Sequence, residues 1–301
     1  MAGKQWQAAG LLTISMGLAM AATATAAPGK GADSKVAGVA IAAAAVSDTE
    51  ARKLATEVKQ EALHAWSQVE AQVVPPFMVA TADGKTSIAI DTAAAPDLQD
   101  WARTKLAPVL ALWYPRIDEL LASDGFVAPI HVIITFKPEP GVAETIGTEV
   151  SGNSEWFRKQ LDGEAVGAMV HELVHVVQQY GDREPETFPP WLTEGIADYV
   201  RFFEFEPDYH GADDVWLARR DLSKVRFDGG YRQSANFLDW VTRKYDPQIV
   251  QKLNAAARRG DYNEGIWRQR TGKTVVELDE EWMKEKRAVR AAAAQVSMDA
   301  H

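Results

Sequence analysis

The chain has 301 residues, of which 47% are hydrophobic and 25% charged, and these values are ordinary for a globular protein with a full hydrophobic core. Its formal net charge of −10 argues against a nucleic-acid-binding protein, because phosphates are neutralised by a basic face. The chain has no cysteine, so a disulfide is excluded and any metal site must use histidine and carboxylate ligands.

The N-terminus has the pattern of a secretory signal peptide. Lys4 precedes a charge-free run over residues 5–29, and Ala24, Thr25 and Ala26 form a small-residue cleavage site. We predict that residues 1–26 are removed, which makes the protein periplasmic or extracellular, with no stable membrane association after cleavage. The alternative is an uncleaved membrane anchor, because the run is about long enough to span a bilayer.

Two segments separate this leader from the rest of the chain. Residues 27–46 are rich in alanine, glycine and valine and read as a low-complexity linker. A capping box from Ser47 to Glu50 predicts a helical segment over residues 47–75, which ends at a proline pair. The sequence leaves open whether this segment packs on the following domain or is a removable pro-segment.

The next part of the chain predicts a small sheet. The expected strands are 77–80, 86–91, a buried strand at 129–136 and an edge strand at 141–151. A helix from Ala95 to about Ala122 is expected between the second and third strands, with a break near Tyr114 and Pro115.

Helices dominate the remainder. A strong helix pattern covers residues 163–180, with Gly181 at the position of a C-terminal cap. Further helices are expected at 190–203, 231–245, 247–258, 263–270 and 274–289. The predicted class is therefore α+β, with a small N-terminal mixed sheet and a mostly helical C-terminal half. We place one domain at residues 76–290, followed by a tail at 291–301.

The helix at 163–180 carries the motif H-E-x-x-H. His171 and His175 are four residues apart, so both rings lie on one helix face and can reach one metal ion. Glu172 lies beside that face, where it can contact a metal-bound water. The simpler alternative is a buried helix whose histidines are satisfied by hydrogen bonds.

A second motif follows on the next predicted helix. Glu194 can supply a third ligand, and Zn²⁺ suits such a set of nitrogen and oxygen ligands. Asp198 lies one turn later on the same face, where it can accept a hydrogen bond from the outer nitrogen of a ligand histidine. The alternative is a solvated helix face, but these acids lie among apolar residues.

These motifs resemble the plant basic secretory protein family of metallopeptidases, as a bacterial member, and are similar to the thermolysin-like glutamate-zincins. The resemblance covers about residues 85–290 and depends mainly on HELVHVV at 171–177, EGIADYVR at 194–201 and GGYRQSANFLDW at 229–240. It implies a zincin-like fold and one catalytic zinc ion held by His171, His175 and Glu194, with Glu172 as the catalytic base. The family's plant members are basic, whereas this chain is acidic.

The sequence thus predicts a secreted zinc-dependent endopeptidase that acts on a peptide or protein. A tetrahedral intermediate needs a hydrogen-bond donor, for which Tyr231 is the first candidate and His210 the second. The segment 141–150 could align a peptide by strand addition. Two alternatives stay open: a non-catalytic binding module on a zinc scaffold, and a zinc hydrolase of a non-peptide bond. The sequence gives no oligomeric state.

Overall fold

The computed structural model describes residues 49–50, 52–61, 74–181 and 188–299. The predicted signal peptide and linker lie outside these residues. The chain divides into two units, residues 1–57 and 58–301. The described part of the first unit is helical, as expected for the segment that begins at Ser47. The domain limits proposed from the sequence stay predictions.

A mixed sheet of five strands opens the second unit. The strands are β1 (Phe77–Ala80), β2 (Ser87–Asp91), β3 (His131–Lys137), β4 (Ala143–Ile146) and β5 (Glu149–Asn153), in the spatial order β1-β2-β3-β5-β4. β2, β3 and β5 run parallel to one another, whereas β1 and β4 are antiparallel edge strands. The predicted single strand at 141–151 is therefore a hairpin, because Gly147 takes a left-handed backbone (φ 62°) and turns the chain.

One face of this sheet forms the core of the unit's first half. Alternate residues of β2 and β3 are buried, as period-two packing requires, including Ile88, Ile90, Val132, Ile134 and Phe136. Helix α3 (Ala107–Leu120) contacts β1, and helix α5 (Ala165–Gln178) contacts β4 and β5. A 3-10 turn, η1 (Pro96–Leu98), a short α-helix, α2 (Gln99–Trp101), and a π-helical turn, η2 (Ala102–Leu106), lead into α3. A short helix, α4 (Ser154–Lys159), follows the sheet.

The predicted break at Tyr114 and Pro115 is wrong, because α3 continues through Pro115. Proline lacks an N–H, so it leaves the carbonyl of Ala111 without its usual partner in the helix. The N–H of Ala82, in the loop after β1, donates to that carbonyl at 2.8 Å. A tertiary hydrogen bond thus replaces the missing helical one.

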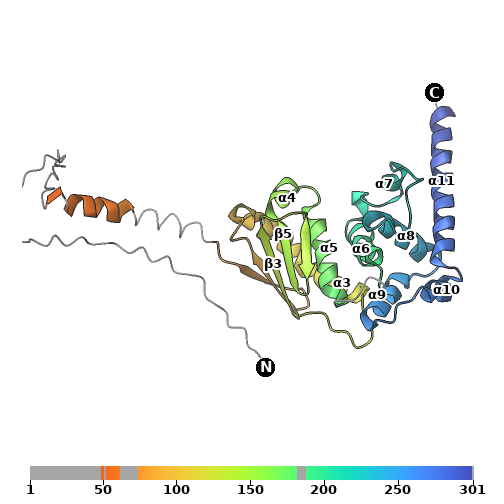
Figure 1. Cartoon of the computed structure of the whole chain (residues 1–301), viewed down its shortest axis with the longest axis horizontal. Helices are drawn as coiled ribbons and strands as arrows, with labels where there is room; N and C mark the ends of the chain where they lie inside the picture. The colour runs from red at the N-terminus through yellow and green to blue at the C-terminus, as the bar shows by residue number, and fades with distance from the viewer. Residues whose placement is uncertain (1–48, 51, 62–73, 182–187, 300–301) are drawn as a thin grey trace, which may run out of the picture. The chain divides into compact units, whose positions relative to one another are not determined.

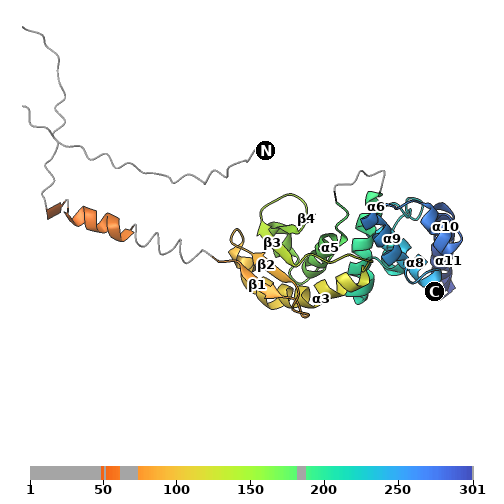
Figure 2. The same ribbon diagram turned by 90° about the horizontal axis from the view of Figure 1, so that it is seen from below.

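Helix α5 lies between the sheet and helix α6 (Pro190–Tyr199) (Figures 1 and 2). The predicted cap at Gly181 is wrong, because Gln179 itself takes the left-handed conformation (φ 47°) and ends α5. Arg258 donates hydrogen bonds to the carbonyls of Val177 (2.7 Å) and Gln178 (3.1 Å). A cation therefore satisfies the last carbonyls of α5 where the helix dipole favours positive charge.

The C-terminal half is helical, which confirms the α+β class. A π-helical turn, η3 (Val200–Phe205), extends α6. The other helices are η4 (Pro207–Tyr209), α7 (Asp214–Ala218), α8 (Tyr231–Lys244), α9 (Ile249–Arg259), α10 (Gly265–Thr271) and α11 (Val275–Asp299). The last of these extends past its expected end at 289, into the segment predicted as a tail.

Helices α6 and α8 form the closest helix pair of this half. Gly195 permits the approach, because a β-carbon at that position would lie 2.7 Å from the β-carbon of Ser234. Phe237, Trp267 and Trp282 fill the interior beside them and are fully buried. None of the helices in the described part of the chain has the length and apolar character needed to cross a membrane.

Candidate metal centre

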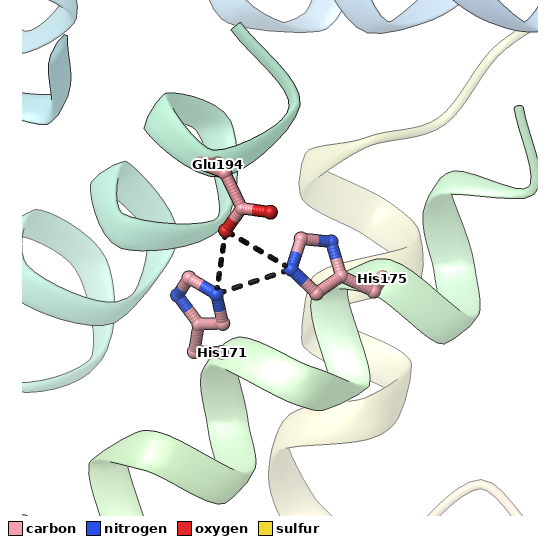
Figure 3. Close-up of side chains that lie close together, drawn as sticks. All are labelled: His171, His175 and Glu194. Atoms are coloured by element: carbon pink, nitrogen blue, oxygen red, sulfur yellow. Dashed lines mark hydrogen bonds and ion pairs between the residues drawn. The ribbon is translucent and has the colours of Figure 1, made fainter. Parts of the chain in front are cut away.

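Three side chains from α5 and α6 converge on one point (Figure 3). His171 Nε2 lies 3.1 Å from His175 Nε2, and these nitrogens lie 3.2 and 3.5 Å from Glu194 Oε2. His171 is buried, whereas His175 and Glu194 are half-buried. The structure thus brings together all three residues that the sequence proposed as metal ligands.

Each histidine is oriented by a hydrogen bond at its outer nitrogen. Nδ1 of His171 lies 2.7 Å from Oδ1 of Asp198, and Nδ1 of His175 lies 2.7 Å from Oε1 of Gln178. The amide nitrogen of Gln178 donates to the carbonyl of Thr193 at 3.0 Å, so its oxygen faces the histidine. Both Nδ1 atoms are therefore donors, which leaves the Nε2 lone pairs directed at the shared point.

The spacing of these atoms fits a tetrahedral zinc shell. With zinc-ligand bonds of 2.0 to 2.1 Å, two ligand atoms of a tetrahedron are about 3.3 Å apart. The observed distances lie between 3.1 and 3.5 Å. Two imidazoles and one carboxylate form the three-ligand set that leaves a fourth position for water or substrate. The residues present therefore fit a catalytic metal ion.

Electrostatics in the metal-free site also favour a cation at this point. Burial lowers the pKa of His171, but hydrogen bonds to Asp198 and Glu194 outweigh burial and raise that pKa to about 10. Burial raises the pKa of Glu194, but hydrogen bonds from the two histidines outweigh it and hold that pKa well below its usual range. A proton or a metal ion is thus retained among these ligands.

Glu172 adjoins this cluster without belonging to it. Its side chain is buried, and its Oε2 accepts a hydrogen bond of 2.6 Å from the hydroxyl of Thr145 on β4. Among the described residues, the group that can share a metal ion contains only His171, His175 and Glu194. The Glu172 carboxylate is thus beside the candidate ligands without being one of them.

The cluster lies in a cleft of about 1090 Å³. Strand β4 lines one side of the cleft and the beginning of α8 lines another, with Glu172 and the three ligand side chains also in its lining. An extended segment of β4 therefore borders the same space as the metal ligands, and the alignment of a peptide along it stays a prediction.

Tyr231 lies at this cleft, above a ligand. Its ring stacks on the His171 ring, with centroids 6.2 Å apart and planes 19° from parallel. The charge of Glu194 raises the pKa of the Tyr231 hydroxyl, which keeps it protonated. Its backbone is left-handed (φ 47°), a conformation that bulky side chains seldom adopt and that recurs at functional sites.

Ser234 of α8 holds the loop before Tyr231 in place through two hydrogen bonds. The Ser234 hydroxyl donates to the carbonyl of Phe227 at 2.7 Å and accepts from the N–H of Gly230 at 3.0 Å. His210, the second candidate donor, pairs with Asp213 at 2.7 Å and is not among the described residues that line the cleft. The geometry therefore favours Tyr231.

Comparison with known proteins identifies the family. The family model described as "Peptidase of plants and bacteria" (BSP) matches residues 126–282. This chain belongs to that family. The match confirms the resemblance to the basic secretory proteins, and it includes α5, α6 and Tyr231. The similarity to the thermolysin-like glutamate-zincins stays a prediction.

One curated relative of this chain is the uncharacterized protein YhcO of Bacillus subtilis (strain 168). The two are 24% identical over 127 residues, which cover 36% of this chain and 39% of the relative. The chain thus spans about two fifths of the length of the relative it matches. No solved structure matches the chain.

Sequence reasoning missed two residues of this centre. Gln178 lies three residues after His175 on the same helix, so the spacing in the motif could have revealed it. Thr145 lies 27 residues before Glu172, on a different element. No local pattern joins those two positions, so only the fold brings them together.

Proposed function

We propose that this BSP peptidase is an exported, zinc-dependent endopeptidase that uses Glu172 as its general base. One observation carries the proposal: two ring nitrogens and a carboxylate oxygen face one point at tetrahedral spacing, beside a buried carboxylate in an open cleft. A binding module would need the ligands but not that carboxylate. Peptides or proteins are the substrates that the family implies.

Zinc held by His171, His175 and Glu194 would polarise the scissile carbonyl and lower the pKa of a water molecule. Glu172 takes the proton of the attacking water and gives it to the amine that leaves. Tyr231 donates a hydrogen bond to the carbonyl oxygen as negative charge develops there. Asp198 and Gln178 hold the ligand rings in the required tautomer.

The test uses the chain from residue 27 onward, incubated with casein before and after treatment with a chelator. We expect cleavage that stops on chelation and returns with zinc. Glu172→Gln should keep stoichiometric zinc and lose about 10²- to 10⁴-fold in rate. The matched control is Glu149→Gln, since Glu149 is an exposed carboxylate of β5 outside the cleft lining.

Other outcomes would point to the alternatives. Zinc binding without cleavage of any peptide would favour a binding module, whereas turnover of esters alone would favour a non-peptide hydrolase. Undiminished turnover by Glu172→Gln would remove Glu172 from the mechanism. Export is tested separately, by N-terminal sequencing of protein recovered outside the cytoplasm, where we expect Ala27 as the first residue.

A further inference from the structure

A hydroxyl on the edge strand contacts the carboxylate proposed as the base. Thr145 Oγ1 lies 2.6 Å from Oε2 of Glu172 and 3.3 Å from the carbonyl oxygen of the same residue. A hydroxyl has one proton to donate, and the shorter contact is to the charged acceptor, where hydrogen bonds are strongest. Thr145 therefore donates to the Glu172 carboxylate.

This hydrogen bond makes the two oxygens of the carboxylate unequal. Within residues 74–181 and 188–299, it is the only hydrogen bond found to the Glu172 side chain. It occupies Oε2, while Glu172 also lines the cleft. Oε1 is thus the carboxylate oxygen with no hydrogen bond among the described residues, and it is the better placed of the two to accept a proton from water.

The position of Thr145 is itself fixed by the sheet. Thr145 pairs with Val150 of β5 in an antiparallel ladder, and its neighbours Glu144 and Ile146 are exposed. Because side chains alternate along a strand, Thr145 is the residue of this stretch that turns toward α5. A side chain with three rotatable bonds, such as Glu172, loses much of that freedom when a rigid strand holds its end.

We propose that Thr145 is a positioning residue that acts through Glu172, holding Oε2 so that Oε1 faces the reacting water. The inference depends on the proposed function, because that function makes Glu172 the group that accepts a proton from water. The competing view is that the Thr145 hydroxyl has a structural role only and links β4 to α5. That view predicts a loss of stability without a specific loss of rate.

The experiment compares Thr145→Val, which keeps the side-chain shape, with Thr145→Ser, which keeps the hydroxyl. We expect Thr145→Val to lower kcat about tenfold or more, the effect of a hydrogen bond to a charged group, with KM within about twofold. Thr145→Ser should restore most of kcat. Zinc content and melting temperature, measured on every variant, should stay near those of the parent protein.

A double-variant comparison separates action through Glu172 from action elsewhere. In the Glu172→Gln background, adding Thr145→Val should cause no further loss of rate, because residues that act as a unit are not additive. Thr148→Val is the matched control, since Thr148 is in the same hairpin but not in the cleft lining.

Several results would overturn the inference. They are an unchanged kcat in Thr145→Val, a further loss in the Glu172→Gln background, or a loss of zinc that explains the loss of rate. Thr145→Ala replaces Thr145→Val if the latter does not fold. An inactive parent protein would refute the proposed function and the inference together. The inference alone would be refuted if the parent is active, Glu172→Gln is inactive and Thr145→Val keeps the kcat of the parent.

Discussion

Substitution of Gln178 tests directly how the metal ligands are held in position. Its side chain is 2% exposed and joins the two ligand-bearing helices. The amide oxygen accepts from Nδ1 of His175 on α5, and the amide nitrogen donates to the carbonyl of Thr193, the residue before Glu194 on α6. Gln178→Leu keeps nearly the same volume and removes both hydrogen bonds.

The expected loss follows from those two contacts. Removing the partner of a ligand histidine typically lowers metal affinity by about 10- to 100-fold, which is about 1.4 to 2.7 kcal/mol of binding free energy. The Thr193 carbonyl also loses one hydrogen bond, which contributes about 0.5 to 1.5 kcal/mol to folding stability. The three ligands themselves remain, so binding should weaken without being abolished.

The measurement is a zinc titration of metal-free protein against a competing chromophoric chelator. Gln179→Asn is the matched control, because Gln179 is the adjacent amide and, among the described residues, its side chain bonds only to the backbone carbonyls of Gly147 and Val176. Gln178→Glu retains an acceptor for His175 and should bind zinc more tightly than Gln178→Leu. Equal affinities for Gln178→Leu and the parent protein would refute the reasoning.

Three further predictions concern the same centre. Tyr231→Phe should lower kcat by about 10²-fold with zinc content unchanged; a kcat within twofold of the parent would exclude the hydroxyl from catalysis. In chelator-treated protein, the pKa of His171 is raised from 6.5 to about 10, so its stabilising contribution is full below pH 6.5 and is lost as the pH rises through about 10. The urea midpoint should fall over that interval, and the fall should be smaller in His171→Gln; an equal fall in both would contradict the assignment. Gly195→Ala would place a β-carbon 2.7 Å from that of Ser234, so we expect a loss of about 1 to 3 kcal/mol in urea unfolding together with weaker zinc binding. Unchanged values for both would show that α6 and α8 can separate at little cost.

The sequence predicted the parts of the site that depend on one helix at a time. His171 and His175 are one turn apart on α5, and Glu194 and Asp198 are one turn apart on α6. Helical spacing fixes each pair locally, so their faces follow from the period of 3.6 residues. The α+β class followed in the same way from strand and helix periods.

Three of the failures share one cause, which is contact between segments distant in the chain. Pro115 does not break α3, because Ala82 supplies the hydrogen bond that the helix lacks. Gln179 ends α5 before Gly181, where Arg258 of α9 supplies donors for the last carbonyls. Thr145 joins Glu172 only after a hairpin has formed. Such partners are outside the range of any local pattern.

The two sides of the cleft differ in how freely they can change. Glu194 and the start of α8 belong to helices that touch at Gly195, so a substitution there would disturb the metal ligands. Strand β4 has one neighbour in the sheet. The side chains of Glu144 and Ile146 on this strand are exposed and do not belong to the hydrophobic core. Under the proposed function, substitution at those positions, which line the cleft, would change which peptides bind while the metal ligands stay in place. Specificity and catalysis would then depend on different elements of the fold.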